Sequence, residues 1–189
     1  MDLSFGSEYE TFRTEVRDFI TNNRENAPSG RSNPADAKQC QKTLIENGYT
    51  ARTIPEAYGG FGAKPDIIRS RIIAEEFADS GIQGGMGGQG ISMLVPTLLE
   101  VGSEAQKLEF VKPTIEGDMV WCQGYSEPGA GSDLASLRTN AVMDGDDWVI
   151  NGQKIWTSTA HLADWIFCLV RTEPDAKNIM VFHFCFSAW

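Results

Sequence analysis

Two short segments in the second half of the chain combine residue types that suit ligand binding. The segment EPGAGSD at 127–133 has a proline to fix a turn and glycines that let the backbone approach a ligand closely. Its Ser132 and Asp133 can donate and accept hydrogen bonds. The segment KIWTST at 154–159 places the indole of Trp156 directly before three hydroxyl side chains. A flat aromatic ring beside hydroxyls suits a planar heterocycle, although a simple turn and a half-buried alternating strand would also explain the two patterns.

A third segment, GGMGGQG at 84–90, contains a formal GxGxxG pattern. In a dinucleotide-binding fold this pattern follows a strand and opens a helix. The residues that precede it here, RSRIIAEEFADSG, have the spacing of a helix. The sequence therefore predicts a loop or close helix packing at 84–90, and not a dinucleotide fingerprint.

The first part of the chain has the apolar spacing of amphipathic helices. Helices are predicted at residues 9–20, 36–47, 67–77 and 103–111. Gly48 should end the second of these helices, and Pro113 should end the last. Ser103, with Gln106 three residues later, predicts a capping box at the start of that last helix.

After residue 135 the pattern becomes that of β-hairpins. Tight turns are predicted at Asp144-Gly145 and at Asn151-Gly152. Strands are predicted at residues 141–143, 148–150, 153–156 and 164–171. Helices followed by antiparallel strands indicate the α+β fold class, with segregated helical and strand parts rather than an alternating βαβ sheet.

The composition is that of a globular chain and argues against several classes of function. The 189 residues are 41% hydrophobic and 10% aromatic, which is enough to bury a sizeable core. The net charge of -10 opposes nucleic-acid binding, because the phosphates would be repelled. The cysteines have no paired spacing, which argues against a metal site, a redox CxxC motif and a disulfide-bonded domain. Each of them is expected to be a small buried hydrophobe: Cys40, Cys122, Cys168 and Cys185.

The sequence predicts neither a membrane span nor a secretion signal. The longest apolar run, residues 165–170, is far shorter than the roughly 20 residues of a membrane-spanning helix. The acidic start, MDLSFGSEYE, lacks the basic and then apolar pattern of a signal peptide. These features predict a soluble, cytoplasmic protein.

The combination of WCQGYSEPGAGSD at 121–133 with VINGQKIWTS at 149–158 resembles the acyl-CoA dehydrogenase family. Four further landmarks agree in their order along the chain: IPEAYGGFG at 54–62, the pair Glu75 and Glu76, VGSEAQK at 101–107 and KPTIEGD at 112–118. The resemblance implies an N-terminal helical domain over residues 1–119, followed by part of an antiparallel β-barrel domain over residues 120–179. It also implies a C-terminal helical bundle that residues 1–189 would not include.

The resemblance further implies FAD as the cofactor, bound between domains. The segment 123–132 would follow the flavin, with Ser126 at the pyrimidine end of the ring and Ser132 near the CoA arm of the substrate. Trp156 would lie against the isoalloxazine, and Ser158 would place a hydroxyl near the reactive N5, where the family more often has threonine. The implied cofactor-binding residues are Gln123, Tyr125, Ser126, Gly131, Ser132, Trp156, Thr157 and Ser158.

The implied reaction is the α,β-desaturation of an acyl-CoA thioester, in which a carboxylate removes the α-proton while the β-hydride passes to flavin N5. Electrons would leave to an electron-transfer flavoprotein, and the full-length protein would form a homo- or hetero-tetramer. The base belongs to the family's C-terminal bundle, so no catalytic residue is assigned and the chain by itself is not expected to turn over. Glu75 and Glu76 are expected to be exposed helix charges, and Glu127 belongs to the flavin loop.

Two other kinds of function fit the same segments. A flavin-dependent monooxygenase or an acyl-CoA oxidase would use a similar fold, although EPGAGSD at 127–133 favours the dehydrogenase. A truncated copy that is inactive, or that binds only a partner, is the second alternative.

The glycine-rich segment carries an expectation about the substrate. Residues 82–92 correspond in order to a family segment that helps to floor the acyl pocket. Five of the seven residues at 84–90 are glycine, so few side chains would fill the space beside this segment. This composition favours a bulky, branched or ring-bearing acyl group over a short linear one.

The last ten residues, MVFHFCFSAW at 180–189, depart from the family pattern where a strand is expected. Apolar residues run through both faces and His183 interrupts them, which suits neither a half-exposed strand nor a capped helix. In a shifted reading frame the codons of these residues require a glycine at Met180 and a leucine at 184–185, where the family has both. We therefore predict a frameshift, so that His183 and Cys185 would be neither ligands nor nucleophiles.

Overall fold

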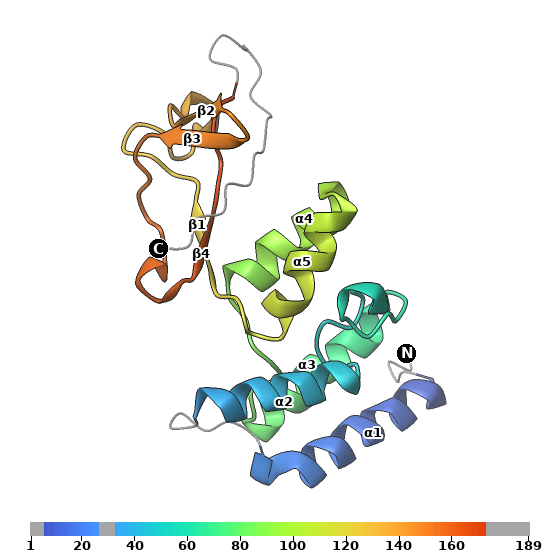
Figure 1. The fold of residues 1–189 in the computed structure, drawn as a ribbon. Helices are drawn as coiled ribbons and strands as arrows, with labels where there is room; N and C mark the ends of the chain where they lie inside the picture. The colour runs from blue at the N-terminus through green and yellow to red at the C-terminus, as the bar shows by residue number, and fades with distance from the viewer. Residues whose placement is uncertain (1–5, 27–32, 173–189) are drawn as a thin grey trace. The chain divides into compact units, whose positions relative to one another are not determined.

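The computed structural model describes residues 6–26 and 33–172 (Figure 1). The tail at 180–189, for which the sequence predicts a frameshift, lies outside these residues, and so does Cys185. The described residues contain the α-helices α1 (Ser7–Asn23), α2 (Pro34–Glu46), α3 (Ile67–Ser80), α4 (Val95–Val101) and α5 (Glu104–Ile115). They also contain the strands β1 (Trp121–Gly124), β2 (Asn140–Asp144), β3 (Asp147–Asn151) and β4 (Trp165–Cys168).

The chain divides into two units, each of which is described by itself. Residues 1–87 and 98–118 form the first, called here the helical unit. Residues 88–97 and 119–189 form the second, called the strand unit. Helices and strands are therefore segregated in the main, as the α+β prediction required.

The predicted helices at 9–20, 36–47 and 67–77 are confirmed as α1, α2 and α3. The sequence analysis missed one helical segment, because its glycine-rich start hides the apolar spacing. This segment begins with a π-helical turn at Gly90–Leu94 and continues as α4. The side chains that hold it in place are fully buried: Leu94, Val95 and Leu98.

Most helix ends follow from local chemistry. The capping box of Ser103 and Gln106 is present at the start of α5. Gly48, with a φ of +71°, follows the C-cap of α2, as predicted. The prediction that Pro113 would end α5 is wrong, because the helix continues through it to Ile115. Proline at this position removes one hydrogen bond of the helix, and burial of Thr114 and Ile115 favours the extra residues.

The core of the helical unit lies between α1, α2 and α3. Helices α1 and α3 pack against each other along their apolar stripes. The ring of Tyr49 adds to this core and lies 4.5 Å from the ring of Phe19, centroid to centroid. The buried residues of the core are Phe12, Val16, Ile20, Leu44, Ile72, Ile73 and Phe77.

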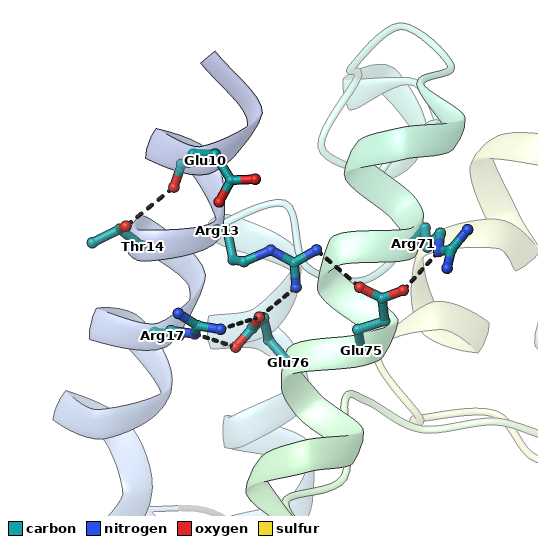
Figure 2. Close-up of polar contacts among 7 residues, drawn as sticks. All are labelled: Glu10, Arg13, Thr14, Arg17, Arg71, Glu75 and Glu76. Atoms are coloured by element: carbon teal, nitrogen blue, oxygen red, sulfur yellow. Dashed lines mark hydrogen bonds and ion pairs between the residues drawn. The ribbon is translucent and has the colours of Figure 1, made fainter. Parts of the chain in front are cut away.

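A buried carboxylate links α1 to α3 (Figure 2). The prediction that Glu76 is an exposed charge is wrong: its side chain is 5% exposed and receives Arg13 Nη1 and Arg17 Nε, each at 2.6 Å. Arg13 also contacts Glu75 at 2.9 Å, and Arg71 contacts Glu75 from the same helix. Burial by itself would raise the pKa of Glu76, but the hydrogen bonds from Arg17 and Arg13 outweigh it and lower that pKa. The pairing explains how a charge can lie in the helix interface.

The strands of the described residues form two separate pairs. Strands β2 and β3 form the predicted antiparallel hairpin. Strands β1 and β4 are parallel, which corrects the prediction of antiparallel strands throughout. The ring of Trp121 stacks on that of Trp165 across this pair, at 5.6 Å between centroids. Among residues 119–172 these pairs do not close a barrel, so the β-barrel stays a prediction.

The hairpin is shifted by one residue from its predicted turn. Asp144 pairs with Asp147, so the two turn residues are Gly145, with a φ of +65°, and the residue after it. The second predicted turn and the strand at 153–156 are wrong, because β3 ends at Asn151 and no strand follows until β4. Gly152 is needed for a different reason: a Cβ there would collide with Thr139.

Breaking the link between α1 and α3 should destabilise the chain. We expect Arg13→Met to lower the free energy of unfolding by about 3 kcal/mol, because it removes one partner of a buried carboxylate. Urea denaturation of the full chain measures this change. Arg71→Met is the matched control, since Arg71 is 68% exposed and its pair with Glu75 is worth at most about 1 kcal/mol. Equal destabilisation by the two variants would contradict this role of Glu76.

Candidate functional site

The structure brings the two chemistry-bearing segments together inside the strand unit. The segment that begins at Ser126 follows β1, and the segment 154–159 follows β3. The backbone N–H of Ile155 donates to the carbonyl of Ser126 at 2.8 Å. The ammonium of Lys154 donates to the carbonyl of Tyr125 at 3.0 Å. These two contacts join residues that are 29 positions apart in the chain, so they hold the two segments side by side.

A buried ion pair lies directly beside these contacts. Lys154 Nζ is 2.8 Å from Glu127 Oε1, and the two side chains are 9% and 7% exposed. The same carboxylate accepts hydrogen bonds from the backbone N–H of Arg138, at 2.7 Å, and of Thr139, at 2.9 Å. Glu127 is thus the acceptor on which three parts of the strand unit converge.

The predicted turn at EPGAGSD is confirmed. The backbones of Glu127 and Ala130 exchange two hydrogen bonds, at 2.8 and 3.1 Å, which close a turn over the proline and glycine between them. Ala130 packs with Leu137 and Leu169 in a small core below the turn. The residues that follow Ala130 face solvent: Gly131, Ser132 and Asp133.

The environment of Glu127 fixes its charge. Burial raises the pKa of a carboxyl group, but the ammonium of Lys154 and the two backbone N–H donors outweigh that effect. Together they lower the pKa of Glu127 to about 2. The side chain is therefore an anion at neutral pH, and such a weak base is poorly suited to removing a proton from a substrate.

Trp156 has an unusual conformation for a large apolar side chain. Its φ is +57°, and 83% of its surface is exposed. The interpretation of 154–159 as a half-buried strand is wrong, because the segment has no strand. Non-glycine residues with positive φ are uncommon and often mark functional sites. The exposed indole offers a flat apolar face to a ligand.

Several polar groups of the segments 123–133 and 154–159 are without partners in the described part of the chain. The hydroxyl groups concerned make no hydrogen bond to another described residue: Ser126, Ser132, Thr157 and Ser158. Gln123 accepts a hydrogen bond from Gln89 Nε2 at 3.3 Å, and the other amide atom, Gln89 Oε1, is buried and unpaired. Tyr125 packs edge-on against Phe167. An exposed indole with free donors and acceptors beside it fits a planar heterocycle such as a flavin.

Sequence reasoning missed two residues of this site. Lys154 is the only charged side chain between Trp148 and Ala163, with histidine taken as neutral. A single charge in such a stretch could have indicated this residue from the sequence. Gln89 lies in the glycine-rich segment, which drew attention to its glycines instead.

The glycine-rich segment is a loop, as predicted, over residues 84–88. A buried glutamine of the helical unit anchors it: Gln41 Oε1 accepts from the backbone N–H of Met86 at 2.7 Å, while its Nε2 donates to the carbonyl of Ile115 at 2.6 Å. The backbone has φ values above +120° at Gly85 and Gly88, which only glycine adopts readily.

Other kinds of site find no support in residues 6–26 and 33–172. These residues contain no group of three or more side chains that could hold a metal ion. Of the three cysteines in these residues, Cys122 and Cys168 are buried, as predicted, and Cys40 is half-buried. None of their helices is long and apolar enough to span a membrane.

Comparison with known families matches both parts of the chain. Residues 6–118 match the family described as "Acyl-CoA dehydrogenase, N-terminal domain", and residues 122–184 match "Acyl-CoA dehydrogenase, middle domain". The chain belongs to the acyl-CoA dehydrogenase family. Among curated relatives, acyl-CoA dehydrogenase IpdE1 of Mycobacterium tuberculosis is 39% identical over 179 residues, which cover 89% of this chain and 46% of that protein.

Solved acyl-CoA dehydrogenase structures share the fold over a similar length. The structure named "Tcur3481-Tcur3483 steroid ACAD" has a TM-score of 0.66 and 34% identity. The match covers 93% of this chain and 46% of the chain in that structure. A glutaryl-CoA dehydrogenase from Mycobacterium smegmatis in complex with FADH2 has a TM-score of 0.57 and 26% identity, and covers 89% and 44%. The chain thus spans about half the length of the relatives that it matches.

The buried Glu127 should make stability depend on pH in a defined window. Because its pKa is lower in the folded chain, its contribution is complete above its ordinary value of 4.5 and is lost as pH falls toward about 2. We expect Glu127→Gln to be less stable than the wild type by on the order of 3 kcal/mol at neutral pH. This difference should shrink by up to about 1.4 kcal/mol per pH unit below the ordinary pKa.

Urea denaturation between neutral and acidic pH measures the difference directly. Asp146→Asn is the control for the loss of one negative charge, because Asp146 is an exposed residue of the hairpin turn. A difference between wild type and Glu127→Gln that stays constant with pH would show that the charge of Glu127 does not matter.

Proposed function

We propose that the strand unit of this acyl-CoA dehydrogenase family member holds part of an FAD site and that the full-length protein α,β-desaturates an acyl-CoA thioester. The observation that carries the proposal is the exposed indole of Trp156, held at positive φ beside unpaired hydroxyl groups. When bound, FAD would supply the hydride acceptor for the reaction. A related glutaryl-CoA dehydrogenase is known in complex with FADH2, which supports the choice of cofactor.

The residues of the site divide the work of binding. Trp156 would cover one face of the isoalloxazine, and the hydroxyl of Ser126 would hydrogen-bond the pyrimidine end of the ring. Ser158 would place a hydroxyl near N5, with Thr157 beside it. Ser132, on the solvent side of the turn, would contact the CoA arm of the substrate. Gln123, Tyr125 and Gly131 would complete the cofactor contacts.

The catalytic base is expected outside the described residues. Glu76 is held by two arginines, and Glu127 is an anion with a pKa of about 2, so neither is suited to accept a proton at neutral pH. Neither of these two carboxylates is therefore proposed as the base, which the family resemblance places in a C-terminal bundle. Electrons would pass to an electron-transfer flavoprotein, in a tetrameric full-length protein.

The glycine-rich loop supports a bulky acyl group as the substrate. A Cβ placed at Gly87 or Gly88 meets no atom within 4 Å, so the space beside these residues is open. A relative of the same fold is named a steroid ACAD, a substrate class with fused rings. An oxidase or monooxygenase of the same fold has no such observation in its favour.

Binding of FAD tests the cofactor part of the proposal. We expect Trp156→Ala to weaken FAD binding to the full chain by about tenfold, the effect of losing one aromatic stacking contact. Equilibrium dialysis measures the affinity without relying on tryptophan fluorescence. Leu162→Ala is the control, because Leu162 is an exposed apolar residue of the same unit, at 66% exposure. If wild type and Trp156→Ala bind FAD equally well, the proposed flavin face is wrong.

Steady-state kinetics of the full-length protein test the substrate class. We expect a ring-bearing acyl-CoA to give a higher kcat/KM than butyryl-CoA, because the glycine-rich loop leaves room for a wide acyl group. Filling the loop by Gly87→Leu should reduce the preference for the ring-bearing substrate. A clear preference of the unaltered protein for butyryl-CoA would contradict the substrate class and leave the cofactor site standing.

A further inference from the structure

The side chains of Glu127 and Lys154 connect segments that secondary structure does not connect. Strand β3 ends at Asn151, and the residues from Gly152 to Thr157 belong to no helix or strand. Across to the other segment, the hydrogen bonds of this stretch are those of Ile155 with Ser126 and of Lys154 with Tyr125 and Glu127. Two of these three bonds come from the ammonium of Lys154.

The conformation at Trp156 requires such an attachment. A tryptophan at positive φ costs on the order of 1–3 kcal/mol and persists only where its surroundings over-determine it. The side chain of Trp156 contributes few packing contacts that could hold this conformation, since 83% of its surface is exposed. The two residues before it, Lys154 and Ile155, make the hydrogen bonds that fix the backbone. The exposed indole is therefore placed by its neighbours.

The two residues of the ion pair differ in how many segments they contact. Glu127 accepts from Lys154 and also from the backbone N–H of Arg138 and Thr139. Loss of Lys154 would leave the carboxylate with two backbone donors, so the segment at 137–139 would stay attached. Loss of the carboxylate would weaken the attachment of both segments: 154–158 would keep its bonds to Ser126 and Tyr125, and 137–139 would keep those from Arg171 to the carbonyls of Leu137 and Thr139. Removing each partner should therefore loosen a different set of segments.

We propose that Lys154 and Glu127 are positioning residues that hold the segments 125–127 and 154–158 together before any cofactor binds, so that Trp156 and Ser126 face the flavin preorganised. The part of this inference that concerns the flavin rests on the proposed function. Neither residue is catalytic, because both act through the neighbours that they hold.

Hydrogen exchange of the full chain without cofactor tests the positioning directly. We expect Lys154→Met to speed exchange at least tenfold in peptides covering 124–131 and 153–159, with 137–140 and α3 unchanged. Glu127→Gln should speed exchange in the same two peptides and in 137–140 as well. Arg13→Met, which breaks a buried pair between α1 and α3 in the helical unit, is the control and should speed exchange around α1 and α3 only.

Two outcomes overturn the inference: wild-type exchange in both peptides of Lys154→Met, or equal acceleration throughout the chain, which would make the pair a general stabiliser. FAD affinity, measured by dialysis, separates the two proposals. If exchange behaves as expected but the wild-type chain does not bind FAD, the proposed function fails and the positioning stands. If the wild type and Lys154→Met bind FAD equally and exchange equally, the positioning fails and the cofactor site stands.

Discussion

The arrangement of the strand unit depends on the buried ion pair between Glu127 and Lys154. Burying two charges is costly unless they meet at close range and their remaining hydrogen-bonding capacity is satisfied. Both conditions hold here, with the ammonium 2.8 Å from the carboxylate and two backbone N–H groups on the same acceptor. The pair also fixes the local geometry, because it joins a turn after β1 to an irregular segment after β3. The candidate site is made of these two segments.

The helical unit uses the same device for a different purpose. Glu76 lies in the interface of α1 and α3 and is neutralised by Arg13 and Arg17 (Figure 2). There the pair orients two regular helices, which already share an apolar core. In the strand unit the pair orients backbone that no regular element holds. Loss of the Glu76 pairs should therefore lower the stability of the helical unit, whereas loss of the pair between Glu127 and Lys154 should lower the local order of the strand unit.

Local features of the fold could be predicted from the sequence, and features that depend on distant residues could not. The capping box at Ser103 and the hairpin around Gly145 follow from short-range chemistry, and both are present. The burial of Glu76 could not be foreseen, because its partners lie about 60 positions earlier in the chain. The parallel pairing of β1 with β4 has the same origin in distant contacts. For the site, residue types drew attention to Trp156 and Ser126, whereas the fold was needed to bring them together through Lys154.

The most direct test of the central claim is the NMR spectrum of the nitrogen-labelled full chain during addition of FAD. We expect the indole N–H signal of Trp156 and the amide signals of Ser126 and Ile155 to shift together as FAD binds. The indole signal of Trp148, in the β2–β3 hairpin, should stay in place and serves as the internal reference. Shifts at Trp148 without shifts at Trp156, or no shift at any of these signals at saturating FAD, would contradict the claim that these two segments form a flavin face.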